Sequence, residues 1–121
     1  MSGFPNLRYF ICCFVLLFRF LTSNVIGQCN NQDPYPADTV PLQCGTTVVT
    51  SQISTGEYSL TSGYANIMIH IITSSVNTDY ITIRKASDNM LITHGITPVN
   101  FNYLSSFGNI EIHVNASINC N

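Results

Sequence analysis

Hydrophobic and polar residues alternate along much of the second half of the chain. The alternation is clearest over 67–72, 80–84 and 110–115, where isoleucine or valine fills every second position. Successive side chains of a strand point to opposite faces, so each segment predicts one buried face and one wetter face. Residues 67–72 are apolar on both faces except at His70, which predicts a central strand covered on both sides.

Short strands of this kind are predicted throughout the chain after Gly45, because β-branched and aromatic residues dominate between turn-forming residues. The expected strands cover residues 46–53, 57–61, 65–73, 79–85, 90–93, 98–103 and 109–115. Turn signals recur about every 8 to 14 residues, a spacing typical of a sandwich or barrel. No window keeps a helical period. The sequence therefore predicts an all-β chain, an antiparallel β-sandwich of about seven strands.

The first 27 residues predict a signal peptide. Arg8 precedes ten consecutive apolar residues over 9–18, whereas a membrane-spanning helix needs about 20. Val25 and Gly27 occupy the −3 and −1 positions for cleavage before Gln28. We expect a secreted, extracellular protein without a membrane span in the mature chain. An uncleaved signal anchor is the alternative.

Charge is scarce in the expected mature chain. Arg84 and Lys85 are its only Lys or Arg residues, against six Asp and Glu residues. Nucleic-acid binding needs a basic patch or stripe, which this composition does not supply. We therefore expect no nucleic-acid partner.

Residues 28–43 predict an extended arm ahead of the folded domain. Pro34, Pro36 and Pro41 lie there among Asn and Asp residues, a mixture that resists both a helix and a strand ladder. The sandwich domain is then expected to span residues 44–121, a length that suits a single domain.

Three cysteines remain in the mature chain, and an oxidising compartment favours pairing. Cys44 precedes the first predicted strand and Cys120 follows the last, and antiparallel first and last strands would bring the two together. This argument favours a Cys44–Cys120 disulfide and leaves Cys29 unpaired or intermolecular, as in a disulfide-linked homodimer. A Cys29–Cys44 pair stays open, because spacing alone does not settle connectivity.

A single N-glycosylation sequon occurs, Asn115-Ala116-Ser117. Strand alternation places Asn115 on the face of Glu111 and His113, opposite the isoleucines of the same segment. The Asn115 side chain is therefore expected to point to water and to carry a glycan.

Four aromatic residues are expected at turns or on wetter faces, and they form the candidate binding surface: Tyr64, Tyr80, Tyr103 and Phe107. Tyrosine serves recognition because it combines an apolar ring with a polar tip. The alternative is that these rings close the ends of the sandwich. Sugar stacking is less favoured, because the chain has no Trp.

Catalytic and metal-binding motifs are absent from the sequence. It has no Gly-x-Ser-x-Gly, His-Glu-x-x-His, phosphate-binding loop or Gly-rich dinucleotide turn. Its three histidines do not have the close spacing typical of a zinc site. We therefore expect no enzyme activity, no cofactor and no metal. A small secreted hydrolase using Asp79 and Glu57 is the enzymatic alternative.

Four features resemble the CUB and CUB-like extracellular modules over residues 44–120. They are Cys44-Gly45, the apolar strand 67–72, the run Asp79-Tyr80-Ile81-Thr82-Ile83 and the closing strand 110–114. The resemblance implies a jelly-roll sandwich, and it is closer to reduced CUB-like modules of invertebrate secreted proteins, some associated with defence against microbes. Many CUB modules bind calcium through one Glu and two Asp, and only Asp79 corresponds to a ligand here.

Together these patterns predict a secreted, non-catalytic module that recognises an extracellular protein or glycan partner, with the resemblance pointing to extracellular defence. A disulfide-linked structural or matrix component is the first alternative. The small hydrolase is the second.

Overall fold

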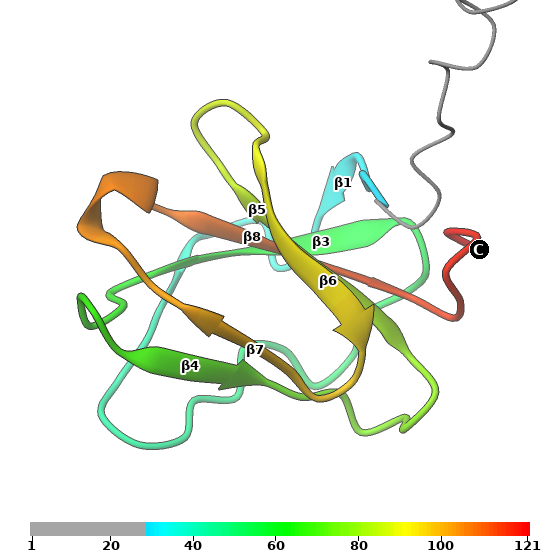
Figure 1. Cartoon of the computed structure of the whole chain (residues 1–121). Helices are drawn as coiled ribbons and strands as arrows, with labels where there is room; N and C mark the ends of the chain where they lie inside the picture. Colours follow the sequence, from blue (N-terminus) through cyan, green and yellow to red (C-terminus); the bar gives the residue numbers. More distant parts are fainter. Residues whose placement is uncertain (1–28) are drawn as a thin grey trace, which may run out of the picture.

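Two β-sheets form a sandwich in the computed structural model, which describes residues 29–121 (Figure 1). The predicted signal peptide lies outside these residues. The larger sheet contains β1 (Asp33–Pro34), β2 (Val40–Pro41), β3 (Glu57–Ser62), β5 (Tyr80–Lys85), β6 (Leu91–Ile96) and β8 (Ile110–Asn115). The smaller sheet contains β4 (Ile69–Ile72) and β7 (Val99–Asn102), and the 3-10 helix η1 (Ser105–Phe107) precedes β8. The all-β sandwich prediction is confirmed.

Strand order in the larger sheet is β1-β3-β8-β5-β6, with β2 also paired to β3. The pairs β3–β8, β8–β5 and β5–β6 are antiparallel, whereas β1 and β2 run parallel to β3. Ile81 and Ile83 of β5 lie opposite Val114 and Ile112 of β8. Because both strands alternate in the same phase, their isoleucines share one face of the sheet.

The hydrophobic core lies between this isoleucine face and the smaller sheet. Its buried members are Tyr64, Ile81, Ile83, Val99, Phe101, Tyr103, Ile110 and Ile112. The ring of Tyr64 lies 5.5 Å from Phe101 and 5.1 Å from Tyr103, between ring centroids. Its hydroxyl lies 2.6 Å from Thr61 Oγ1, and burial raises the pKa of Tyr64 to about 12.

The segment predicted to be a central strand is instead an edge strand. β4 pairs only with β7 among the described residues, and Ile69 and Ile71 point to solvent. His70 and Ile72 face inward, and the ring of His70 lies 4.9 Å from that of Tyr64. The prediction of coverage on both faces is wrong, because a period of two identifies two faces and does not say which one meets the core. Residues 46–53, also predicted as a strand, form none.

The proline-containing segment joins the larger sheet. The sequence places an extended arm at 28–43, outside a domain that starts at Cys44. In the structure, β1 and β2 of this segment pair with β3, and Cys29 is buried. Short parallel pairings tolerate proline at a sheet edge, where one side of the strand needs no ladder partner. The folded unit therefore includes residues 29–43.

The disulfide joins Cys29 to Cys120, with a Cα–Cα distance of 5.2 Å, and Cys44 is exposed and unpaired. The predicted Cys44–Cys120 pair is wrong, and so is the unpaired Cys29. The prediction relied on a first strand directly after Cys44, and that strand does not form. Cys29 instead lies on β5, where its N–H donates to Thr82 Oγ1 at 3.3 Å.

Candidate functional site

The aromatic residues of the predicted binding surface do not form an exposed patch. Tyr64, Tyr80 and Tyr103 are each at most 8% exposed, and Phe107 packs against the core. The Tyr103 hydroxyl donates to the carbonyl oxygen of Gly108 at 3.0 Å, which ties η1 to the core. The rings of Tyr64, Tyr103 and Phe107 therefore close the sandwich, whereas Tyr80 is buried on the outer face of the larger sheet. The prediction of an exposed binding surface on these residues is wrong. Turn position alone did not reveal their burial.

An apolar surface occurs instead on β4 and the turn before it. We call it the β4 edge patch: Ile67, Met68, Ile69 and Ile71, with exposed fractions of 71%, 56%, 71% and 62%. Backbone hydrogen bonds between Ile67, Met68 and Tyr103 hold the turn beside the end of β7. A contiguous exposed apolar surface commonly marks an interaction site. The alternation in the sequence contains this signal, but it predicts a buried face equally well.

The patch borders an unpaired strand edge. Figure 1 shows β4 and β7 side by side in the smaller sheet. Among residues 29–121, no other strand pairs with β4, so its second edge offers backbone N–H and C=O groups. The segment 65–78 contains no Asp, Glu, Lys or Arg, and such charges are what usually prevent edge pairing. On the neighbouring strand, Asn100 and Asn102 are exposed beside Ile71 and Ile69.

A second candidate region is polar and closed. It lies on the outer face of the larger sheet, under residues 29–32, which we call the N-terminal strap. The Asn31 N–H donates to His113 Nδ1 at 2.9 Å, and Arg84 Nε donates to the Cys29 carbonyl oxygen at 3.0 Å. Asn31, Arg84 and His113 are each at most 8% exposed. The face that alternation marks as wet is therefore covered by the chain's own N-terminal segment.

His113 is neutral in this environment. Burial, with a contribution from the nearby Arg84 charge, lowers the pKa of His113 to about 4. Because Nδ1 accepts the Asn31 N–H, the proton is on Nε2, which lies 3.2 Å from Glu111 Oε2. Burial also raises the pKa of Glu111, against the opposing effect of Arg84. The Glu111–His113 contact is therefore a hydrogen bond from a neutral imidazole, not a full ion pair.

Asn115 lies on the same closed face and is 1% exposed. Among residues 29–121, neither its Nδ2 nor its Oδ1 has a hydrogen-bond partner. The prediction that this side chain points to water is wrong, although its placement on the face of His113 is right. The strap packs on that face through the contact of Asn31 with His113, and a period of two carries no information about such long-range coverage.

The candidate carboxylates bind local groups. Asp79 accepts a hydrogen bond from the Ser74 hydroxyl, and the Asp79 N–H donates to the Val76 carbonyl oxygen at 3.1 Å. Glu57 Oε2 accepts the Ser54 N–H at 2.7 Å. Both residues thus stabilise turns. Within residues 29–121, no group of three or more His, Cys, Asp or Glu side chains is placed to hold a metal ion.

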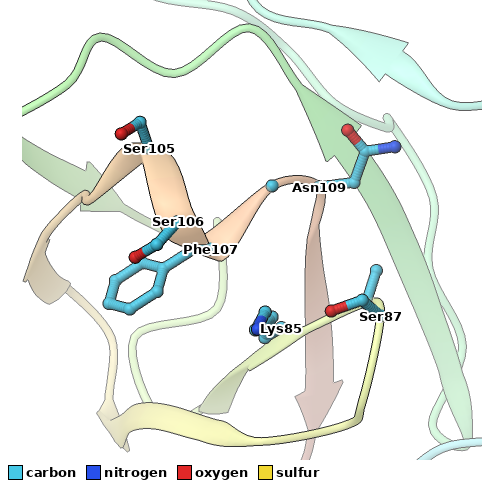
Figure 2. A pocket seen from close by; sticks show the side chains of 8 residues that line it. Lys85, Ser87, Ser105, Ser106, Phe107 and Asn109 are labelled. Atoms are coloured by element: carbon cyan, nitrogen blue, oxygen red, sulfur yellow. The ribbon is translucent and has the colours of Figure 1, made fainter.

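Two open hollows occur on the surface. The larger, of about 400 Å³, lies between the β5–β6 turn and η1, and Figure 2 shows side chains that line it: Lys85, Ser87, Ser105, Ser106, Phe107 and Asn109. Its serine hydroxyls have no histidine or carboxylate among the lining residues, whereas a nucleophilic serine needs a positioned base. The smaller, of about 180 Å³, lies between Asn31 of the strap and the side chains of Tyr58 and Glu111.

Comparison with protein-family models, with curated proteins and with solved structures finds no match for this chain. No helix in residues 29–121 has the length and hydrophobicity needed to cross a bilayer. The β4 edge patch and the covered polar face are therefore the features that bear on function.

Proposed function

We propose that this chain is a secreted, non-catalytic binding module that recognises an extracellular protein partner. The observation that carries the proposal is the unpaired edge of β4 with its four exposed apolar side chains. An extended segment of the partner would pair with this edge as an additional strand. Main-chain hydrogen bonds would supply affinity, and alternate side chains would pack beside Ile69 and Ile71.

A protein segment fits this surface better than a glycan. Sugars commonly stack on exposed aromatic rings, and here Tyr64, Tyr80 and Tyr103 are buried. The edge offers unpaired peptide groups and aliphatic side chains, which match another strand of low charge. Support for an extracellular location comes from the predicted signal peptide, the disulfide and the resemblance to CUB-like modules. The local roles of Asp79 and Glu57 weigh against the hydrolase alternative.

We expect Ile69→Lys to weaken this binding while leaving the fold intact. Short peptides selected from a phage-displayed random library against the wild-type protein should share an alternating, uncharged apolar pattern. Their affinity for Ile69→Lys should fall at least about tenfold, because a lysine on the edge disfavours strand addition. The affinities are measured by isothermal titration, and amide NMR shifts should be largest within β4.

Met90→Lys is the matched control. Met90 is an exposed apolar residue at the β5–β6 turn, away from β4, so peptide affinity should not change. Selected peptides that bind Ile69→Lys and the wild type equally would refute the β4 docking site. Binding to a glycan array that is equal for the wild type and Ile69→Lys would show that the partner is a glycan and not a protein.

A covalent homodimer is the second candidate, and one observation favours it. Cys44 is exposed and is the cysteine left without a disulfide partner among residues 29–121. In an oxidising compartment such a thiol pairs readily with a second copy. Non-reducing electrophoresis of the secreted protein should show a dimer band that reduction removes and Cys44→Ser abolishes. A dimer that persists in Cys44→Ser would contradict this linkage.

A further inference from the structure

Asn115 combines two properties that conflict in the folded chain. It is the acceptor residue of the sequon Asn115-Ala116-Ser117, whose modification requires access to the Asn115 amide nitrogen. Yet this side chain is 1% exposed, and both of its polar atoms lack partners among residues 29–121. Buried polar groups in native proteins are nearly always hydrogen-bonded. An orphaned buried amide inside a sequon therefore points to a second state in which Asn115 is exposed.

The N-terminal strap stabilises the closed state, in which Asn115 is buried. Asn31 packs on the face of β8 that carries His113 and Asn115. Its N–H donates to His113 Nδ1, and its Nδ2 lies 3.4 Å from the Val114 carbonyl oxygen. Cys29 binds the neighbouring β5 through Thr82 and is 1% exposed. The Cys29–Cys120 disulfide then joins the strap to the turn directly after β8.

The same turn also engages the rest of the sequon. The Ala116 N–H donates to the Asn121 carbonyl oxygen at 2.7 Å, and the Cys120 N–H donates to the Ser117 carbonyl oxygen at 3.1 Å. The Ser117 hydroxyl is hydrogen-bonded to the Asn121 side chain. An oligosaccharide-transferring enzyme must bind both the asparagine and the hydroxyl residue of a sequon. The closed turn keeps both residues from the enzyme.

We propose that Asn115 is an N-glycosylation site that is open only while the Cys29–Cys120 disulfide is unformed, so that glycan and disulfide exclude each other within one molecule. In the glycan transfer, Asn115 Nδ2 bonds to C1 of a lipid-pyrophosphate-linked oligosaccharide. The C1–O bond to the pyrophosphate breaks, and the nitrogen loses one proton. In the competing reaction, the two thiols lose two protons and two electrons to a disulfide oxidant, which is reduced to a dithiol.

The two products differ in what the outer face of the larger sheet presents. Disulfide closure gives the covered face seen here, with Arg84 and His113 under the strap. A glycan on Asn115 leaves the strap without its disulfide to the turn after β8, so this polar face stays open. The inference shares with the proposed function the expectation of passage through a secretory compartment, but it does not depend on the β4 edge patch.

A purified reaction tests the exclusion without relying on secretion. The full chain carrying Val76→Asn is incubated with purified oligosaccharyltransferase and lipid-linked oligosaccharide, in oxidised and in reduced form. The substitution creates a second sequon, position 76 with Asn77 and Thr78, at an exposed turn. This site is an internal reference in every molecule. Intact-protein mass spectrometry after thiol alkylation counts the glycans and the alkylated thiols on each molecule, and peptide mapping assigns them to Asn115, position 76 and the cysteines.

Position 76 should be modified in both forms, and Asn115 only on molecules whose Cys29 and Cys120 are both alkylated. Occupancy of Asn115 in the oxidised form should be at least about tenfold below that of position 76, because local opening is then rare. Comparable occupancy of both sites on disulfide-closed molecules would overturn the proposal. So would an unmodified Asn115 in reduced chains whose position 76 is modified.

Counting alkylated thiols on each glycosylated molecule keeps the test valid even if reduction unfolds the chain. Peptide binding at β4, measured on the oxidised protein, is independent of this outcome. The proposed function and the glycan exclusion can therefore fail separately.

Discussion

Cys29→Ser lowers the free energy of unfolding by about 4 to 5 kcal/mol, because the disulfide with Cys120 closes a loop across a sequence separation of 91 residues. Cross-linking such distant residues removes many conformations from the unfolded chain. Small domains are stable by about 5 to 15 kcal/mol, so this loss removes much of the total. Urea unfolding of the oxidised protein, followed by circular dichroism, measures the difference.

Cys44→Ser is the control for this prediction. Cys44 is exposed and unpaired, and surface substitutions away from special features usually change stability by less than about 0.5 kcal/mol. The two variants together separate the connectivity seen in the structure from the Cys44–Cys120 pair expected from spacing. A large loss in Cys44→Ser with little loss in Cys29→Ser would contradict the Cys29–Cys120 bond.

Strand positions were predictable from sequence because local alternation specifies them. The segments 57–61, 79–85 and 109–115 correspond closely to β3, β5 and β8, and the isoleucines at alternate positions of β5 and β8 reach the core. Side chains on a strand repeat every two residues whatever the rest of the fold does. Local pattern therefore identified the strands that build the core of the larger sheet.

Which face of β4 meets the core could not be predicted in the same way. Both of its faces are apolar apart from His70, so alternation gives no sign of which one meets the core. In the structure, the His70 ring packs against Tyr64 and Phe101, while Ile69 and Ile71 remain exposed. The candidate site thus consists of residues whose hydrophobicity predicts burial but which the structure shows to be exposed.

The covered polar face was missed for a different reason. Glu111, His113 and Asn115 alternate with apolar residues, which predicts a face in contact with water. The structure covers that face with the N-terminal strap, tens of residues away in sequence, through contacts such as Asn31 N–H to His113 Nδ1. Such coverage depends on long-range packing. Cys29, a cysteine close to the expected start of the mature chain, was the one sequence signal that could have indicated it.

Lowering the pH from 6.5 to 4 destabilises the protein by about 3 kcal/mol through His113, since each unit of pKa difference corresponds to about 1.4 kcal/mol. The folded pKa of His113 is lowered from 6.5 to about 4. The unfolded chain therefore binds this proton first as the pH falls. Stability is fully present above the unfolded value and is lost progressively until the folded value is reached. Thermal or urea unfolding across this range measures the loss.

The groups around His113 set the size of this loss. Arg84 on β5 disfavours the imidazolium, and the ring of Tyr58 on β3 stacks on His113 at a centroid distance of 5.2 Å. Burial raises the pKa of Glu111, so protonation of Glu111 favours the folded state as the pH falls and acts in the opposite direction. The measured decline is therefore the loss at His113 less this gain at Glu111.

His113→Gln isolates this titration. The glutamine carbonyl oxygen can accept the Asn31 N–H in place of Nδ1, but it does not bind a proton in this pH range. The variant should be less stable than the wild type at pH 7 and should lose much less stability on acidification to pH 5. Carboxylates elsewhere contribute equally to both proteins and cancel in the difference. Equal slopes of stability against pH would show that protonation of His113 is not what destabilises the protein.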